Sequence, residues 1–254
     1  MKKQELWRIC AYFIIYSFAG FVFETLYALI FHRVLESRQS FLYGPFCGIY
    51  GVGATLMIIT LRKYKDNNIK LFLGGMLVGS VAEYIISLVG EILLGIRCWD
   101  YSNYPLNING RICILFSICW GVAAFLLIKF INPAIDLTLD EIIKKVKNTK
   151  YLKILLILIM TFILIDCIIT FTAVDFFIAN TAEIYNLELM NEEKVGLTYR
   201  YASKYPKLKN KLSAFASNER MIMTYPNLTL TLKDGTQVLI KSLMPEVRDC
   251  YYRF

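Results

Sequence analysis

Five long apolar runs fill most of the first 178 residues and constrain the fold more than any other feature. They cover residues 7–31, 43–61, 71–95, 112–131 and 152–178. A helix needs about 20 apolar residues to cross the ~30 Å hydrocarbon core of a bilayer. Because the runs are continuous rather than alternating, they predict helices and not the strands of a barrel. The sequence therefore predicts an all-α polytopic membrane protein with five transmembrane helices.

Lysine and arginine gather at alternate ends of these runs and predict the orientation. One set of flanks carries Lys2, Lys3, Arg8, Arg62, Lys63, Lys65, Lys70, Lys144, Lys145, Lys147, Lys150 and Lys153. The opposite set carries Arg33, Arg38, Arg97 and Arg111. Because positive flanks stay cytoplasmic, we expect the N-terminus inside and the C-terminal tail outside. The net charge of +8 thus reflects the ends of spans, and we expect a lipid bilayer and no nucleic acid as partner.

Composition changes near residue 180, which divides the chain into an expected transmembrane domain (1–180) and a small extracytoplasmic α+β tail (181–254). Residues 227–243 read NLTLTLKDGTQVLIKSL, two alternating runs around Asp-Gly, which predicts a β-hairpin. Residues 199–218 are expected to be helical. The connection 132–151 is expected to hold a short amphipathic helix on the anionic inner leaflet, with docking of a cytoplasmic partner as the alternative.

Carboxylates inside the apolar runs indicate a functional site. They are Glu24, Glu83, Glu91, Asp166 and Asp175. An ionisable group in lipid is costly, so it faces protein or water. We expect Glu83 and Asp166 near mid-bilayer, Glu24 somewhat farther out, and Glu91 and Asp175 near the outer end. With no lysine or arginine at the deeper level, these acids are either protonated or share the site with a cation. The alternative is that each acid is neutral and hydrogen-bonds a neighbouring helix.

The loop at 96–112, IRCWDYSNYPLNINGRI, is expected to cover this site as a lid, although an aromatic belt at the membrane boundary is the simpler interpretation. The expected substrate-binding residues are Glu24, Glu83, Glu91, Trp99, Asp100, Tyr101, Asn107, Arg111 and Asp166. Small residues such as Gly75 and Gly79 predict close helix packing. With one histidine and no clustered cysteines, the sequence predicts no metal site and no cofactor.

Three stretches together resemble a known family. They are FLYGPFCGIYG (41–51), WDYSNYPLNINGRI (99–112) and SICWG (117–121). In order and spacing they resemble the bacterial membrane proteins described as Putative ABC-transporter type IV, or CmpB-like, over roughly the first 130 residues. The resemblance implies a permease component in the bacterial cytoplasmic membrane. No G-x-x-x-x-G-K-[ST] motif occurs, so ATP hydrolysis would require a separate ATPase subunit.

Three functions follow as hypotheses. The first is a transporter-like component with an acidic, outward-facing site that binds a small solute or cation, or relays protons. The second is an intramembrane enzyme that acts on a lipid or lipid-linked substrate at the outer leaflet, with Glu91, Asp100 and Arg111 as its reactive groups. No nucleophile motif supports the enzyme. The third is a sensor or assembly partner whose tail engages the cell envelope.

Overall fold

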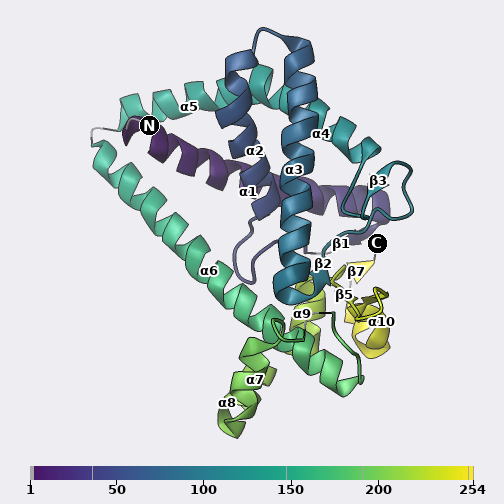
Figure 1. Ribbon diagram of the computed structural model, residues 1–254. Helices are drawn as coiled ribbons and strands as arrows, with labels where there is room; N and C mark the ends of the chain where they lie inside the picture. The colour runs from purple at the N-terminus through teal and green to yellow at the C-terminus, as the bar shows by residue number, and fades with distance from the viewer. Residues whose placement is uncertain (1–2, 36, 147, 191, 251, 254) are drawn as a thin grey trace. The chain divides into compact units, whose positions relative to one another are not determined.

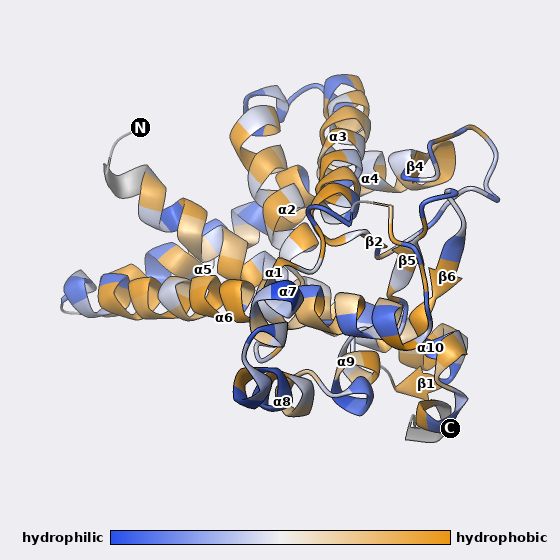
Figure 2. Ribbon diagram, turned by 60° about the horizontal axis from the view of Figure 1, so that its bottom comes forward, coloured by the Kyte–Doolittle hydropathy of each residue, from blue (hydrophilic) through white to orange (hydrophobic). Residues whose placement is uncertain are grey.

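The computed structural model describes residues 3–35, 37–146, 148–190, 192–250 and 252–253, so Lys2 and Lys147 lie outside the described residues. Helices dominate the fold (Figure 1). Four helical stretches are long and apolar enough to cross a membrane: Leu6–Phe31, Asn68–Leu94, Ile114–Lys145 and Thr149–Ile184. The chain is therefore a multi-pass helical membrane protein, as predicted. In Figure 2 the longest of these helices is mostly hydrophobic along its length.

The expected second span differs from the prediction. Helix α2 (Gly48–Leu61) has 14 residues, or about 21 Å at ~1.5 Å per residue, which is shorter than the ~30 Å core. Residues 43–47 are apolar but not helical. Gly44 precedes Pro45, and a residue before proline is biased away from helical conformation. The expectation of five full-length spans is therefore not confirmed, because hydropathy does not report where the backbone leaves the helix.

The expected surface helix after the fourth run exists but is not separate from it. Helix α4 (Ile114–Leu126), a π-helical turn η2 (Leu127–Ile131) and α5 (Asn132–Lys145) follow without a break. Pro133 lies at the start of α5, where the wider π turn rearranges the hydrogen-bond ladder around its missing N–H. The apolar run and the amphipathic stretch therefore form one continuous helix.

Two compact units make up the chain, each built from three stretches. The first contains residues 1–20, 46–84 and 101–164, and the second contains residues 21–45, 85–100 and 165–254. Helices α1 (Lys3–His32), α3 (Asn68–Leu94) and α6 (Thr149–Ile184) contribute to both. A functional boundary near residue 181 stays a prediction.

In the first unit, α2 runs antiparallel to the start of α1. The Cys47 amide, just before α2, donates to the Ser17 carbonyl at 2.8 Å. At the other end, Arg62 shares Asp136 with Arg8 of α1. A 3₁₀ turn η1 (Arg62–Tyr64) leads on to α3, which lies beside α2 in Figures 1 and 2. A short hairpin, β3 (Asn107–Ile108) with β4 (Ile112–Cys113), precedes α4.

The second unit holds the predicted hairpin. Strands β5 (Thr229–Thr231) and β6 (Gln237–Leu239) pair antiparallel around a turn in which Gly235 has φ +85°, a value that glycine tolerates best. A third strand, β2 (Ile96–Arg97), comes from the loop after α3 and pairs with β5. The loop after α3 thus joins the sheet formed by the hairpin.

Short elements complete this unit. Its remaining helices and strands are α7 (Leu197–Ser203), α8 (Pro206–Phe215), α9 (Asn218–Thr224), α10 (Ile240–Leu243), η3 (Pro245–Cys250), β1 (Val34–Leu35) and β7 (Tyr252–Arg253). The prediction that residues 199–218 are helical is confirmed over most of their length. Phe176, Phe177, Met221, Leu230 and Met244 are buried together in its core. The end of α6 therefore packs into the core of the tail rather than standing apart from it.

Candidate functional site

Glu83 of α3 is the centre of the candidate site, which lies within the first unit. Its side chain is buried, with 4% of the residue exposed. Oε1 accepts a hydrogen bond from the Tyr101 hydroxyl at 2.8 Å, and Oε2 accepts one from Trp120 Nε1 at 3.0 Å. Both donors are uncharged. The carboxyl group is therefore hydrogen-bonded at both oxygens and has no cationic partner among the described residues.

Packing fixes both donors. A Cβ atom on Gly79 would lie 2.4 Å from Trp120 Cγ, so the indole occupies the space that this glycine leaves open. Between α3 and α4, the hydroxyl oxygens of Ser80 and Ser117 lie 2.7 Å apart and share a hydrogen bond. The Tyr101 ring stacks on Phe116 with its centroid at 4.6 Å. Because small residues let α3 and α4 approach closely, the indole N–H reaches the carboxylate.

Asp166 of α6 has a different set of partners, within the second unit. Its carboxylate accepts the backbone N–H of Tyr43 at 3.2 Å and that of Gly44 at 2.8 Å. Thr170, one turn further along the same helix, accepts the N–H of Leu42 at 2.8 Å. A non-helical backbone at membrane depth needs such acceptors because lipid supplies none. Asp166 therefore stabilises the non-helical segment that leads into α2.

Glu91 and Asp175 also hold the second unit together. Glu91 Oε1 accepts from Arg97 Nε at 2.8 Å and from the Thr231 hydroxyl at 2.9 Å, which ties α3 to strands β2 and β5. Asp175 accepts the N–H groups of Gly196 and Thr198 at 2.6 and 2.7 Å, at the start of α7. Both acids therefore accept hydrogen bonds from groups of the second unit and hold its helices, strands and loops together.

The remaining predicted site residues are dispersed between the two units. Glu24 is half-buried on α1 and Trp99 is half-buried in the loop after β2, both in the second unit. Asp100 of the same unit has Arg97 at 3.9 Å. Asn107 of the first unit bonds the carbonyls of Ser102 and Tyr104 and shapes its own loop. The buried Arg111 guanidinium lies 5.7 Å from the Tyr84 ring centre. Of the predicted set, the structure brings Glu83 and Tyr101 into direct contact.

A polar cluster that sequence reasoning missed lies elsewhere in the first unit. Asp136 is buried and accepts from Arg62 at 2.8 Å, from Arg8 at 3.3 Å and from the Tyr12 hydroxyl. Arg8 also pairs with Asp140. Two arginines thus face two aspartates, so the cluster balances its own charge and fastens α5 to α1 and α2. Asp136 lies in the stretch 132–151, which the sequence predicts to be a connection between spans. Its burial is therefore not evident from the sequence.

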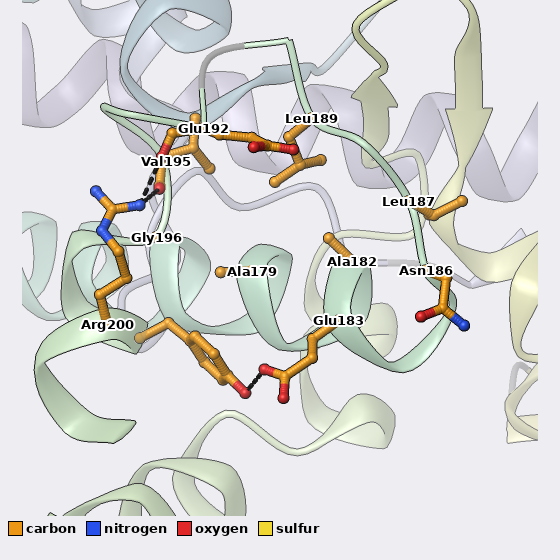
Figure 3. A pocket seen from close by; sticks show the side chains of 11 residues that line it. Ala179, Ala182, Glu183, Asn186, Leu187, Leu189, Glu192, Val195, Gly196 and Arg200 are labelled. Atoms are coloured by element: carbon orange, nitrogen blue, oxygen red, sulfur yellow. Dashed lines mark hydrogen bonds between the residues drawn. The ribbon is translucent and has the colours of Figure 1, made fainter. Parts of the chain in front are cut away.

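A cavity of about 520 Å³ lies in the second unit between the end of α6 and the loop before α7 (Figure 3). Ala179, Ala182 and Val195 form its apolar lining. Glu183 accepts from the Tyr199 hydroxyl, and the Arg200 guanidinium donates to backbone carbonyls of the loop. Because these polar groups are already hydrogen-bonded within the protein, the cavity indicates a ligand less clearly than the surroundings of Glu83 do.

Trp120 contacts Glu83 in the candidate site but is not among the residues predicted from the sequence. It belongs to SICWG (117–121), one of the three stretches that carry the family resemblance, and Tyr101 belongs to another. The N–H groups of Tyr43 and Gly44 belong to the third. Each of the three stretches therefore supplies hydrogen-bond donors to a buried acid. Membership in these stretches is the sequence feature that indicates the partners of Glu83 and Asp166. Among the described residues, no group of three or more His, Cys, Asp or Glu side chains could hold a metal ion.

The fold and these sites define a multi-pass helical membrane protein with buried carboxylates. Residues 11–171 match the family described as Putative ABC-transporter type IV. The chain belongs to this family, and the match extends beyond the resemblance found by inspection. No curated protein and no solved structure matches the chain.

Proposed function

We propose that this protein is a transport component of the bacterial cytoplasmic membrane, in which the carboxylate of Glu83 binds a small cationic solute or ion. The observation that carries the proposal is the burial of Glu83 with only uncharged donors. Removing a carboxylate from water is costly unless it is paired with a cation or gains a proton. A bound cation would supply the missing charge.

The other buried acids support this choice by contrast. Glu91 has the guanidinium of Arg97, and Asp136 has two arginines. Asp166 and Asp175 accept backbone N–H groups of segments that need acceptors. Their partners explain them as parts of the fold. Glu83 alone among these five is held by a tyrosine and a tryptophan side chain, which are uncharged donors and leave the charge of the carboxylate unbalanced.

A separate ATPase subunit is part of the proposal, because family membership supports a transporter and the chain lacks a phosphate-binding loop motif. The alternative of an enzyme at the outer leaflet depended on Glu91, Asp100 and Arg111. Glu91 and Asp100 contact Arg97 in the second unit, and Arg111 belongs to the first. Arg97 thus partners both acids of the enzyme hypothesis, and transport remains the proposal.

The test compares the small-molecule, ion and lipid contents of cells that lack the chain with those of complemented cells. Elemental analysis and mass spectrometry are the readouts. We expect the deletion to change the level of one small solute or ion. The wild-type chain and Glu141→Gln should restore it, whereas Glu83→Gln should not. Glu141 is an exposed carboxylate of α5 and gives the same change of charge without touching the site.

Full restoration by Glu83→Gln would contradict the proposed role of this acid. A changed lipid headgroup with unchanged solutes and ions would overturn transport and favour the enzyme. Expression and membrane insertion of each variant are checked by its yield and elution profile after solubilisation. The wild-type chain, purified gently from native membranes, should carry a stoichiometric ATPase.

A further inference from the structure

We propose that the cation exchanged at Glu83 is a proton, and that it enters and leaves on Oε1 through the hydroxyl of Tyr101. This inference rests on the proposed function and specifies its ligand. It follows from a difference between the two donors. An indole N–H can only donate, whereas a tyrosine hydroxyl can donate or accept. The two oxygens of Glu83 are therefore not equivalent.

Both protonation states of Glu83 keep their hydrogen bonds in this arrangement. When Glu83 is ionised, Oε1 accepts from Tyr101 at 2.8 Å and Oε2 accepts from Trp120 at 3.0 Å. When Oε1 carries a proton, that O–H donates to the Tyr101 oxygen, and Oε2 still accepts from Trp120 as a carbonyl oxygen. No heavy atom has to move. A buried polar group left unsatisfied in either state would cost about 1–3 kcal/mol, and this site avoids that cost.

The transfer itself balances. A proton from a solvent hydronium ion adds to the Tyr101 oxygen while the original hydroxyl hydrogen passes to Glu83 Oε1. Tyr101 ends neutral, Glu83 ends as a neutral acid, and one water molecule remains. The reverse sequence releases the proton. Tyr101 suits this role because it is half-buried on a loop, whereas Glu83 is buried.

The surroundings favour a proton over a larger cation. Magnesium and calcium need about six to eight oxygen ligands, several of them usually carboxylates, and the described residues contain no group of three or more His, Cys, Asp or Glu side chains that could hold a metal ion. The two serine hydroxyls of this region, Ser80 and Ser117, bond each other. An organic cation would have to displace Trp120, whose indole fills the space beside Gly79. A proton requires no displacement.

Other charged or titratable side chains contact this cluster and bear on its pH response. Tyr104 packs edge-on against Tyr101, and Tyr50 of α2 lies 6.3 Å from Trp120 between ring centres. Tyr84 follows Glu83 on α3, and the Arg111 guanidinium lies over its ring. The arginine is the charged side chain among these neighbours, and the others are tyrosines. Glu83 is the carboxyl group on which these neighbours act.

Infrared difference spectroscopy on the full chain in lipid vesicles tests the proposal. Acidification from about pH 10 to about pH 4 should produce the C=O stretch of a protonated acid that depends on Glu83. The band should appear in the wild type and in Glu141→Gln and be absent in Glu83→Gln. In Tyr101→Phe the acid remains but loses its acceptor, so the band should shift to higher frequency. After a pH jump it should also form about 100-fold more slowly.

Two results would overturn the proposal: a spectrum with no Glu83-dependent band, or an unchanged frequency and rate in Tyr101→Phe. If Glu83→Gln fails to fold, the frequency and rate measured in Tyr101→Phe still test the proposal. Failure here is distinguishable from failure of the proposed function. A Glu83-dependent band together with full solute restoration by Glu83→Gln would keep the proton site and remove the transport role. Lost restoration without a band would keep transport and remove the proton.

Discussion

Each buried acid in this chain needs hydrogen-bond or charge partners for its carboxylate, and the acids obtain these partners in different ways. Glu83 uses two aromatic side chains, Glu91 uses an arginine, and Asp166 uses backbone N–H groups. In each case the partner decides what the acid can do. An arginine or an amide fixes a negative charge in place, whereas a hydroxyl that both donates and accepts allows the charge to change. The partner, rather than burial, separates Glu83, for which we propose a function, from the acids that hold the fold together.

Asp166→Ala is expected to destabilise the protein more than Asp166→Asn. Alanine leaves the N–H groups of Tyr43 and Gly44 without their acceptor, at about 1–3 kcal/mol for each buried group. Asparagine keeps one acceptor oxygen. Thermal unfolding in detergent measures the difference. Equal midpoints for the two variants would show that these N–H groups do not depend on the carboxylate.

Tyr225 is expected to limit stability at alkaline pH. Burial raises the pKa of its hydroxyl above the ordinary value of 10.0. Because the folded pKa is the higher one, this group's contribution is fully present below about pH 10 and is lost as the pH rises toward the folded pKa. The unfolding midpoint of the wild type should therefore fall more steeply than that of Tyr225→Phe between about pH 10 and about pH 11. Parallel curves would contradict this.

The sequence identified the acids but could not identify their partners. Tyr101 and Trp120 are 18 and 37 residues from Glu83, and Gly44 is 122 residues from Asp166. No local periodicity encodes such distances. Counting residues from the ends of the runs placed the acids at shared depths, which suggested one site. It could not show that different donors hold each of them.

At the scale of elements, glycines set the distance between α3 and α4. A Cβ atom on Gly75 would lie 2.3 Å from Ala124 Cβ and 3.0 Å from the Trp120 carbonyl oxygen. A Cβ atom on Gly53 of α2 would lie 3.6 Å from the Trp120 ring, an ordinary contact. The two glycines therefore differ in what they do, although both lie in apolar helices. The small-residue spacing in the sequence predicted close packing but not which helix would approach.

Gly75→Ala is expected to lower stability by about 1–3 kcal/mol, because backbone atoms of α4 stand where the methyl group would go. Gly53→Ala is the matched control and should change stability little. Denaturant unfolding of both variants in detergent measures this. A neutral Gly75→Ala would mean that α3 and α4 separate without loss.

For the whole molecule, α2 and the segment before it decide the number of crossings. Arg8 near the start of α1 and Arg62 just after α2 both bind Asp136, so these two points lie at the same level. We infer that the chain returns across the membrane between residues 33 and 61, partly as non-helical backbone. This preserves the orientation predicted from the charges, with residues 62–67 cytoplasmic.

Single cysteines in a background without other cysteines test this topology. A membrane-impermeant maleimide should label Leu35→Cys in intact cells, and it should label Lys65→Cys only after permeabilisation. Native Cys98, which is exposed, should react from outside. Labelling of positions 35 and 65 from one side would mean that the segment does not cross, and the tail would then face the opposite side.

The contact between Asp166 and the segment before α2 also has a consequence for biosynthesis. Gly44 leaves the ribosome 122 residues before its acceptor. At a synthesis rate of about 5–20 residues per second, this delay lasts roughly 6–24 s. During that time the amides of the nascent segment have no partner within the chain, and lipid offers none. The segment must therefore wait at the insertion machinery or in water, and the early part of this protein completes its insertion only after its last membrane helix has been made.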